Sequence, residues 1–279
     1  MSTLESYWSD KVVLVTGASS GLGWAIVEAL APYGIHFGLL SRRREKLQAL
    51  ASKLRESGSS FWLKSCDVRN REEVVSCVKE FHRQIGRLDV AWINSGISRD
   101  TSFENWRWEN MEDVIDTNLK GAIYTTQACL EIMAPQKFGA IVGIGSAASM
   151  RGLPRRSIYS LSKIGLDYYL QSLTAELPDI QFTVIHPGFV DTPINAGNPN
   201  RFWMLTPEKA AKLMVQAVAR RKRLLIFPFR MRLLYRLIHN LPRTWYFKLA
   251  RKLNHLGRPM ESAKSVEAAK SAVQTDSVS

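Results

Sequence analysis

The sequence predicts an α/β fold built around one parallel sheet of about seven strands with helices on both faces. Short runs rich in Val, Ile and Leu alternate with helical patterns of ten or more residues, as in repeated βαβ units. With 279 residues and 46% hydrophobic content, the chain can bury one large core but is too short for two generous ones. We therefore expect a single doubly wound domain.

Seven segments have the composition of buried strands: 12–16, 36–40, 61–66, 90–94, 140–144, 182–186 and 224–227. Helical patterns are expected to begin between them near Leu22, Arg43, Arg71, Met111, Ser157 and Pro207. Thr206 is expected to cap the last of these helices, because a hydroxyl before Pro at the first helical position is a common helix start.

The chain is predicted to divide into a lead at 1–10, the α/β domain at 11–229, a basic amphipathic helical extension at 230–258 and a disordered tail at 259–279. Residues 1–10 lack a basic patch followed by an apolar run, and no apolar stretch is long enough to span a bilayer. We expect a cytoplasmic protein. Its three cysteines lack metal-type spacing and are expected to be reduced core residues, and no metal site is predicted.

The net charge of +13 comes from one part of the chain. Between Lys209 and Met260 there are fourteen Lys or Arg residues and no Asp or Glu, so the remainder balances at −1 (24 basic minus 25 acidic). A charge so localised argues against a general nucleic-acid-binding surface, and no nucleic-acid partner is expected.

A glycine-rich loop follows the first predicted strand. Glycines let the backbone turn sharply and approach a pyrophosphate, while the next helix offers amide donors and a positive dipole. Three glycines alone are weak evidence, but their place in a βαβ unit favours a cofactor site over a merely tight turn. We predict a Rossmann-type dinucleotide site formed by Gly17, Ser19, Ser20, Gly21, Leu22 and Gly23.

The Gly-x-x-x-Gly-x-Gly spacing resembles the short-chain dehydrogenase/reductase family, and the resemblance extends over most of 11–229. It implies that Asp67 and Val68 contact the adenine. It also implies that Asn94, Ser95 and Gly96 steady the sheet beside the cofactor, with Ser95 standing where the family has Ala. The turn beneath the nicotinamide is expected to involve Pro187, Gly188, Val190 and Thr192.

The end of the second strand indicates which nicotinamide cofactor is bound. NAD enzymes place a carboxylate there, whereas this chain has Ser41 followed by three arginines. A guanidinium pairs with a 2′-phosphate through charge-assisted hydrogen bonds worth roughly 1.5–3 kcal/mol each. We therefore predict NADP(H), with Arg42 as the main contact and Ser41, Arg43 and Ser19 in support. The alternative, a solvated basic start to the next helix, is expected for Arg44.

Tyr159 and Lys163 lie one helical turn apart, so their phenol and ammonium groups share a face. A nearby cation favours the phenolate and lowers a tyrosine pKa from its usual value near 10. Tyr7 and Lys11 have the same spacing, but they precede the first strand. Ser146, thirteen residues before Tyr159 at the end of the fifth strand, favours Tyr159.

The resemblance implies a catalytic tetrad. Tyr159 would give its proton to the substrate oxygen, which Ser146 would hold by a hydrogen bond. Lys163 would lower the phenol pKa and hold the nicotinamide ribose, and Asn118 would bind a water linked to Lys163. Ser149, ten residues before Tyr159, is the weaker candidate for the serine role.

Three segments are expected to form the substrate wall: 97–108, 147–157 and 189–205. Their apolar members favour a lipophilic substrate over a sugar, although several could simply pack loop on loop. These members are Phe103, Trp106, Trp108, Met150, Leu153, Phe202, Trp203 and Met204.

The basic extension is predicted to form two amphipathic helices separated by Pro242. The first apolar stripe comprises Met231, Leu234, Ile238 and Leu241, with Leu233 and Leu237 beside it. The second comprises Trp245, Leu249 and Leu253. Such a bias without any acid favours a peripheral position on the cytosolic face of an anionic membrane. The alternatives are a helix docked on its own domain with a solvated basic face, and a homo-oligomer contact.

These features together predict an NADPH-dependent oxidoreductase that reduces a ketone or aldehyde of a lipophilic substrate. Two alternatives stay open: an NAD(P)-dependent alcohol dehydrogenase working oxidatively, and a non-catalytic NADPH-binding regulatory module. Arg42 speaks against oxidation with NAD, and the complete tetrad speaks against the regulatory module.

Overall fold

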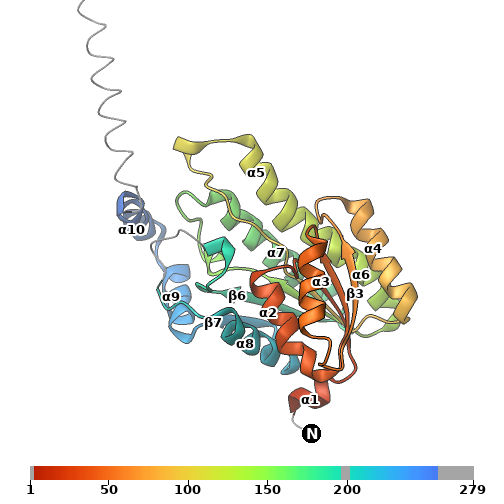
Figure 1. Cartoon of the computed structure of the whole chain (residues 1–279). Coiled ribbons are helices and arrows are strands. Elements are labelled where there is room, and N and C mark those ends of the chain that lie inside the picture. The colour runs from red at the N-terminus through yellow and green to blue at the C-terminus, as the bar shows by residue number, and fades with distance from the viewer. Residues whose placement is uncertain (1–2, 196–201, 257–279) are drawn as a thin grey trace, which may run out of the picture. The chain divides into compact units, whose positions relative to one another are not determined.

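The structure, a computed structural model, describes residues 3–195 and 202–256. Its centre is a seven-stranded sheet in the order β3-β2-β1-β4-β5-β6-β7, with every neighbouring pair parallel (Figure 1). The strand order reverses between β1 and β4, so the sheet is doubly wound, as predicted. The strands are β1 (Val12–Thr16), β2 (His36–Ser41), β3 (Ser60–Ser65), β4 (Val90–Ile93), β5 (Ala140–Ile144), β6 (Gln181–Pro187) and β7 (Leu224–Phe227).

Helices connect the strands and follow the last one. They are α1 (Thr3–Trp8), α2 (Gly21–Leu30), α3 (Arg44–Lys53), α4 (Arg71–Ile85), α5 (Trp108–Ile115), α6 (Gly121–Gln136), α7 (Ser157–Glu176), α8 (Pro207–Ala219), α9 (Phe229–Asn240) and α10 (Arg243–Leu256). Thr206 caps α8 as predicted, its hydroxyl accepting from the amide of Lys209 at 3.4 Å. The helix expected near Met111 begins earlier, at Trp108, and a π-helical turn over Asp116–Lys120 joins it to α6.

Two hydrophobic clusters cover the two faces of the sheet. On β1, Val13 and Val15 pack into the cluster that includes α2 and α8, while Val12 and Leu14 face the cluster that includes α4 and α6. Alternate side chains of a strand point to opposite faces, so a strand covered on both sides must be apolar throughout. This explains why the strands appear in the sequence as continuous apolar runs.

Helix α1 contributes Trp8 to the core, which the sequence pattern did not indicate. Trp8 in α1 is fully buried, its indole Nε1 donates to the carbonyl of Val215 at 3.3 Å, and its ring stacks on Trp92. The three cysteines are buried and free, as expected: Cys66, Cys77 and Cys129.

The chain separates into two compact units, one ending at His239 and the other beginning at Asn240. Helix α9 therefore belongs with the α/β domain, and α10 with the second unit. The tail expected at 259–279 lies outside the described residues. Within 3–195 and 202–256, no helix combines the length and hydropathy needed to cross a bilayer.

Candidate active site

The glycine loop between β1 and α2 has a shape that requires its glycines. Gly17 and Gly21 have φ of +66° and +57°, in the left-handed region that side chains disfavour. A Cβ on Gly23 would lie 2.3 Å from the carbonyl oxygen of Gly17. The backbone of the loop is thus left bare at the start of α2, as a bound pyrophosphate needs.

Asn94 ties this loop to the end of β4. Its Nδ2 donates to the carbonyls of Thr16 at 3.0 Å and Gly17 at 3.3 Å. In return, the Thr16 hydroxyl accepts from the backbone amides of Asn94 and Ser95 at 3.0 and 3.2 Å. Asn94 and the backbone of Ser95 therefore brace the glycine loop.

Asn118 is brought to the site by the π-helical turn between α5 and α6. It is buried, and its side chain exchanges hydrogen bonds with the backbone of Ile97: Nδ2 donates to the carbonyl at 2.9 Å, and Oδ1 accepts from the amide at 2.8 Å. A Cβ on Gly96 would lie 3.3 Å from Lys163 Nζ and 3.4 Å from Asn118 Oδ1. The fold thus brings together three residues that are distant in sequence: Gly96, Asn118 and Lys163.

Lys163 is buried on α7, and its ammonium donates to the carbonyl of Ile144 at 2.7 Å. Burial lowers the pKa of Lys163 to about 8. Its Nζ lies 5.9 Å from the centre of the Tyr159 ring. The lysine is thus close to the phenol, with its proton directed to the end of β5.

Burial raises the pKa of the Tyr159 phenol, while a hydrogen bond with Ser146 and the charge of Arg156 act in the opposite direction. The lowering expected from Lys163 is not among the causes of the shift, and burial prevails. The net effect keeps the phenol protonated at neutral pH, which suits a proton donor.

Ser146 follows β5 and lies in hydrogen-bonding contact with Tyr159. Its hydroxyl also accepts from the amide of Ala148 at 3.1 Å. Ser149 is engaged elsewhere: its buried hydroxyl donates to the carbonyl of Ser146 at 2.7 Å and lies 3.0 Å from Nδ1 of His186. Of the two serines, Ser146 is the one beside the phenol.

Two buried polar residues beneath this serine turn were missed by the sequence analysis. His186 Nδ1 accepts from the backbone amide of Ser146 at 3.1 Å, and its Nε2 lies 2.9 Å from a carboxylate oxygen of Asp167. Both side chains are buried. The available signals were Asp167 one helical turn beyond Lys163, and His186 directly before Pro187-Gly188.

The arginines after β2 differ in their contacts. Arg43 extends its guanidinium to the glycine loop, where Nη2 donates to the hydroxyls of Ser19 at 2.9 Å and Ser20 at 2.8 Å. Its amide also donates to the Ser41 hydroxyl at 3.1 Å. Arg42 is exposed and lies close enough to Asp67 to lower the pKa of that carboxyl. The structure therefore places Arg43, rather than Arg42, against the loop.

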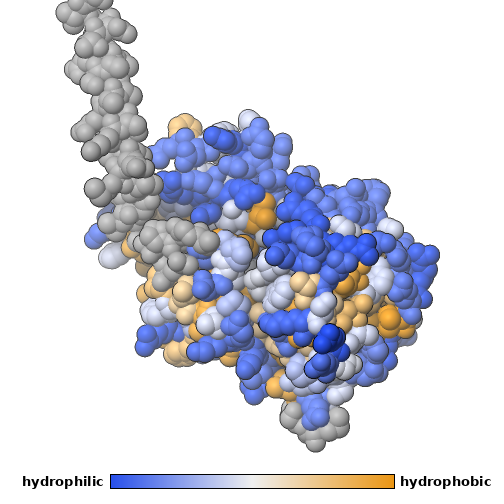
Figure 2. Space-filling view, in the orientation of Figure 1, coloured by the Kyte–Doolittle hydropathy of each residue, from blue (hydrophilic) through white to orange (hydrophobic). Residues whose placement is uncertain are grey.

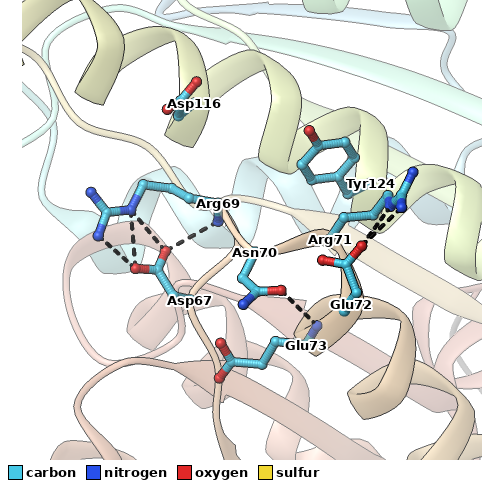
Figure 3. A pocket seen from close by; sticks show the side chains of 8 residues that line it. All are labelled: Asp67, Arg69, Asn70, Arg71, Glu72, Glu73, Asp116 and Tyr124. Carbon is cyan, nitrogen blue, oxygen red and sulfur yellow. Dashed lines mark hydrogen bonds and ion pairs between the residues drawn. The ribbon is translucent and has the colours of Figure 1, made fainter.

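Asp67 borders a polar hollow on the surface (Figure 3). Arg69 holds its carboxylate through Nε and Nη2, and Arg69 Nη1 also donates to Asp113 at 3.1 Å. These bonds, opposed by partial burial, hold the pKa of Asp67 below its usual range. The hollow is lined mainly by charged residues, so it does not suit a lipophilic substrate: Asp67, Arg69, Asn70, Arg71, Glu72, Glu73, Asp116 and Tyr124.

The turn after β6, expected beneath the nicotinamide, is tied to β7 and to the loop before α8. The Gly188 amide donates to the carbonyl of Phe227 at 2.8 Å, and Val190 forms a parallel bridge with Leu205. A Cβ on Gly21 would lie 3.3 Å from the side chain of Thr192. Thr192 therefore packs its Cβ and methyl group against the glycine loop, while its hydroxyl donates to the carbonyl of Val190 at 3.3 Å.

The sequence profile of the short chain dehydrogenase family matches residues 11–201. The chain belongs to the short-chain dehydrogenase family. An uncharacterized oxidoreductase of Myxococcus xanthus is 33% identical over 249 residues, covering 88% of this chain and 98% of the relative. A Staphylococcus aureus (strain USA300) oxidoreductase is 34% identical over 217 residues, covering 77% and 93% of the two chains.

Solved structures of the family have the same fold. An alcohol dehydrogenase of Thermococcus sibiricus complexed with 5-hydroxy-NADP superposes with a TM-score of 0.71 at 27% identity, covering 78% of this chain and 96% of that one. A short-chain dehydrogenase/reductase of Burkholderia phymatum in complex with NAD gives 0.77 at 21% identity, covering 84% and 94%. Neighbours thus bind either cofactor, and the chain is an oxidoreductase for which a nicotinamide cofactor is expected.

Tyr7 and Lys11, which have the same spacing as Tyr159 and Lys163, are separated from this site. Tyr7 lies on α1, where its hydroxyl donates to Gln181 at the first residue of β6, and Lys11 directly precedes β1. Both strands begin there, whereas the short-chain dehydrogenase site lies where the strands end. Burial raises the pKa of Tyr7 to about 12. Its position excludes Tyr7 from the reaction.

Two of the three segments expected to contact substrate, 97–108 and 147–157, are joined by hydrogen bonds near the start of α7. The amide of Thr101 donates to the carbonyl of Arg155 at 3.0 Å, and the Arg155 guanidinium bonds Asp100 at 2.6 Å. In the third segment, Phe202 packs edge-to-face on Phe189 at 5.1 Å. Several of the apolar side chains are exposed: Phe103, Trp106, Trp108, Phe202, Trp203 and Met204. No group of metal-ligating side chains occurs in the described part of the chain.

Proposed function

We propose that the chain is an NADPH-dependent reductase of ketones or aldehydes on lipophilic molecules, with Tyr159 as the proton donor. The observation that carries this proposal is the meeting of Tyr159, Ser146 and Lys163 beside Gly96 and the bare glycine loop. Hydride transfer to a carbonyl requires a proton donor beside a cofactor-binding loop, and both lie at the carboxyl ends of the strands.

The residues present fit a nicotinamide dinucleotide. Gly17, Gly21 and Gly23 leave the loop backbone accessible, and Thr192 borders it. When bound, the cofactor supplies the hydride. The chain's own contribution is to hold the pyrophosphate at the start of α2 and to place the reacting carbonyl near Tyr159.

The preference for NADPH is supported by Arg43. Its guanidinium lies at the glycine loop between two serine hydroxyls, and no carboxylate occupies the end of β2, which is Ser41. A 2′-phosphate offers three strong acceptor oxygens, so it is a better partner for a guanidinium than the hydroxyls of Ser19 and Ser20. Arg42, exposed beside it, adds positive charge.

The proton chemistry follows from the environment of the phenol. Because burial raises the pKa of Tyr159, its proton is held until charge develops on the substrate oxygen. Ser146, in contact with Tyr159, is placed to donate to the same oxygen, and the Lys163 ammonium adds positive charge close by. The developing alkoxide is thus stabilised by neighbouring donors and receives its proton from Tyr159.

The lipophilic substrate is inferred from the side chains around this edge. Aromatic and methionine side chains remain exposed on the segments expected to contact substrate, among them Phe103, Trp106 and Met204. Exposed apolar side chains on segments that contact substrate would favour an apolar ligand. The polar hollow includes Asp67, a residue expected to contact the adenine, and its charged lining does not suit an apolar substrate.

The test is NADPH consumption by the purified full-length chain over ketones and aldehydes of increasing chain length. Rising kcat/KM with chain length is the expected result, with NADH at least tenfold less effective. Turnover restricted to short polar carbonyls would overturn the lipophilic assignment. Faster turnover of alcohols with NAD would establish the oxidative alternative, and tight NADPH binding without turnover the regulatory one.

A further inference from the structure

Helix α9 has an inner face that is docked on the catalytic unit. Met231 is 2% exposed and Leu234 and Ile238 are half-buried, so the apolar stripe expected to face a membrane instead packs inward. Tyr235 stacks on His186 with ring centres 5.6 Å apart. The guanidinium of Arg151 donates to the carbonyl of Ile238 at 3.2 Å, near the end of the helix. This face and the end of the helix thus hold α9 on the unit.

The outer face of α9 carries a second apolar stripe. Phe229, Leu233 and Leu237 follow one another at four-residue spacing, so they share one side of the helix. They are 61%, 50% and 65% exposed. Single exposed apolar residues are common on protein surfaces, but three large ones aligned on one helix indicate a surface with a partner.

Arginines border this stripe. Arg230, Arg232 and Arg236 are exposed, and the guanidinium carbon of Arg232 lies 5.0 Å from the centre of the Phe229 ring. From Phe229 to Leu256 the sequence has seven Lys or Arg residues and no Asp or Glu. In Figure 2 the surface over α9 accordingly mixes apolar and hydrophilic residues. The partner of such a face is both apolar and anionic.

The loop before α8 adds to the same surface. Phe202, Trp203 and Met204 are 44%, 40% and 44% exposed, and the Arg230 guanidinium lies 6.0 Å from the Trp203 ring. This loop leads into Leu205, which is bridged to Val190 in the turn expected beneath the nicotinamide. The outer face of α9 is therefore continuous with a substrate-side segment.

Considered by itself, α10 has the same chemistry. Trp245, Phe247 and Leu249 are exposed, and Lys248 and Arg251 lie among them. Exposed aromatic and basic side chains on one short helix are typical of segments that lie in the headgroup region of a bilayer. Exposed apolar side chains with basic neighbours thus occur in both α9 and α10.

A second copy of the chain is a poor occupant. A two-fold contact through the outer face of α9 would bring the arginines of one copy against those of the other, without an acid on the helix to compensate. An anionic lipid surface satisfies both features, since acyl chains accept the apolar stripe and headgroups accept the arginines.

We propose that the outer face of α9, with Phe202, Trp203 and Met204, binds an anionic phospholipid surface and faces the substrate loop toward it. Each arginine near such a surface raises partitioning by about fivefold. The binding itself is independent of the catalytic role. That substrate arrives from the bilayer rests on the proposed function.

Binding is tested by flotation of the full chain with vesicles of phosphatidylcholine alone or with roughly a third phosphatidylserine. We expect binding to the anionic vesicles only, weakened by salt. Replacing the stripe (Phe229→Ser, Leu233→Ser, Leu237→Ser) should reduce it at least tenfold, as should Arg232→Gln with Arg236→Gln. The matched control replaces exposed residues elsewhere, Phe138→Ser and Arg55→Gln, and should bind as the unmodified chain does.

Three outcomes would overturn the proposal. The first is a full chain that ignores anionic vesicles at low salt, and the second is a stripe variant that still binds like the control. The third is a full chain that sediments as a dimer while the stripe variant sediments as a monomer. In that case the outer face of α9 would bind a second copy of the chain.

Activity measurements distinguish the proposed lipid binding from the proposed reductase function. The stripe variant should keep its kcat/KM for a water-soluble ketone and lose at least fivefold for a long-chain ketone presented in anionic vesicles. Equal losses for both ketones would contradict access through lipid. An unmodified chain that binds vesicles but reduces neither ketone would refute the proposed function and leave lipid binding intact.

Discussion

The imidazole Nε2 of His186 lies 2.9 Å from the carboxylate of Asp167, and this buried pair supports the turn that carries Ser146. Strand β6 supplies the histidine and α7 the aspartate, so the pair links these two elements beneath the turn after β5. Hydrogen bonds from His186 and Gln171 outweigh burial and lower the pKa of Asp167.

Asp167→Asn tests this support. The amide can still accept from His186 but carries no charge, so we expect a loss of about 1–3 kcal/mol in the free energy of unfolding at neutral pH. Because the folded-state pKa of Asp167 is depressed, its stabilisation is present above the unfolded-state pKa and lost as pH falls through the folded value. Urea denaturation at pH 7 and at pH 3 measures it: the two proteins should differ less at the lower pH.

The same variant has a kinetic signature. If the pair positions Ser146, kcat should fall about tenfold while KM for NADPH stays unchanged, since the glycine loop is untouched. Gln171→Ala removes the other partner of Asp167 and should leave kcat nearly as it was. Equal changes in KM and kcat would point to a general structural loss.

Tyr159→Phe removes the proposed proton donor but keeps the ring. Turnover should drop by ~10²–10⁴ because general acid catalysis is lost, with NADPH affinity retained. Steady-state kinetics and cofactor fluorescence measure the two quantities. Tyr7→Phe is the matched control and should retain full turnover; undiminished activity in Tyr159→Phe would remove Tyr159 from the mechanism.

Arg43→Ala should weaken NADPH binding by about tenfold or more and leave NADH binding nearly unaffected, because the proposed contact is to the 2′-phosphate. Arg42→Ala, expected from the sequence to have the main effect, should now have the smaller one, and the exposed Arg44→Ala the least. Binding titrations of each variant with NADPH and with NADH measure these differences in affinity. A matching loss of NADH and NADPH in Arg43→Ala would show that the arginine only braces Ser19 and Ser20.

The pKa of about 8 at Lys163 predicts a pH dependence. The ammonium is present below that pH and lost above it, so kcat/KM for NADPH should decline above about pH 8. Tyr159, whose pKa is raised, does not titrate in this range. Lys163→Arg should move the decline in NADPH affinity to higher pH, whereas an unmodified profile flat to about pH 9.5 would contradict the assignment.

The sequence by itself determined the class of fold, the seven strands and the family. Alternation of apolar runs and helical periods is local, and so are the glycine spacing at Gly17 to Gly23 and the single-turn separation of Tyr159 and Lys163. Such patterns reflect backbone geometry within one element, which neighbouring residues fix.

Tertiary structure alone decided which of several equivalent side chains meets which partner. Arg43 rather than Arg42 contacts the glycine loop, Asp167 meets His186 across nineteen residues, and the stripe of Met231 faces inward while Leu233 remains exposed. Each outcome depends on where a separate segment of chain passes in space. Periodicity predicts that a helix has an apolar face, but the packing of other elements decides which face is covered.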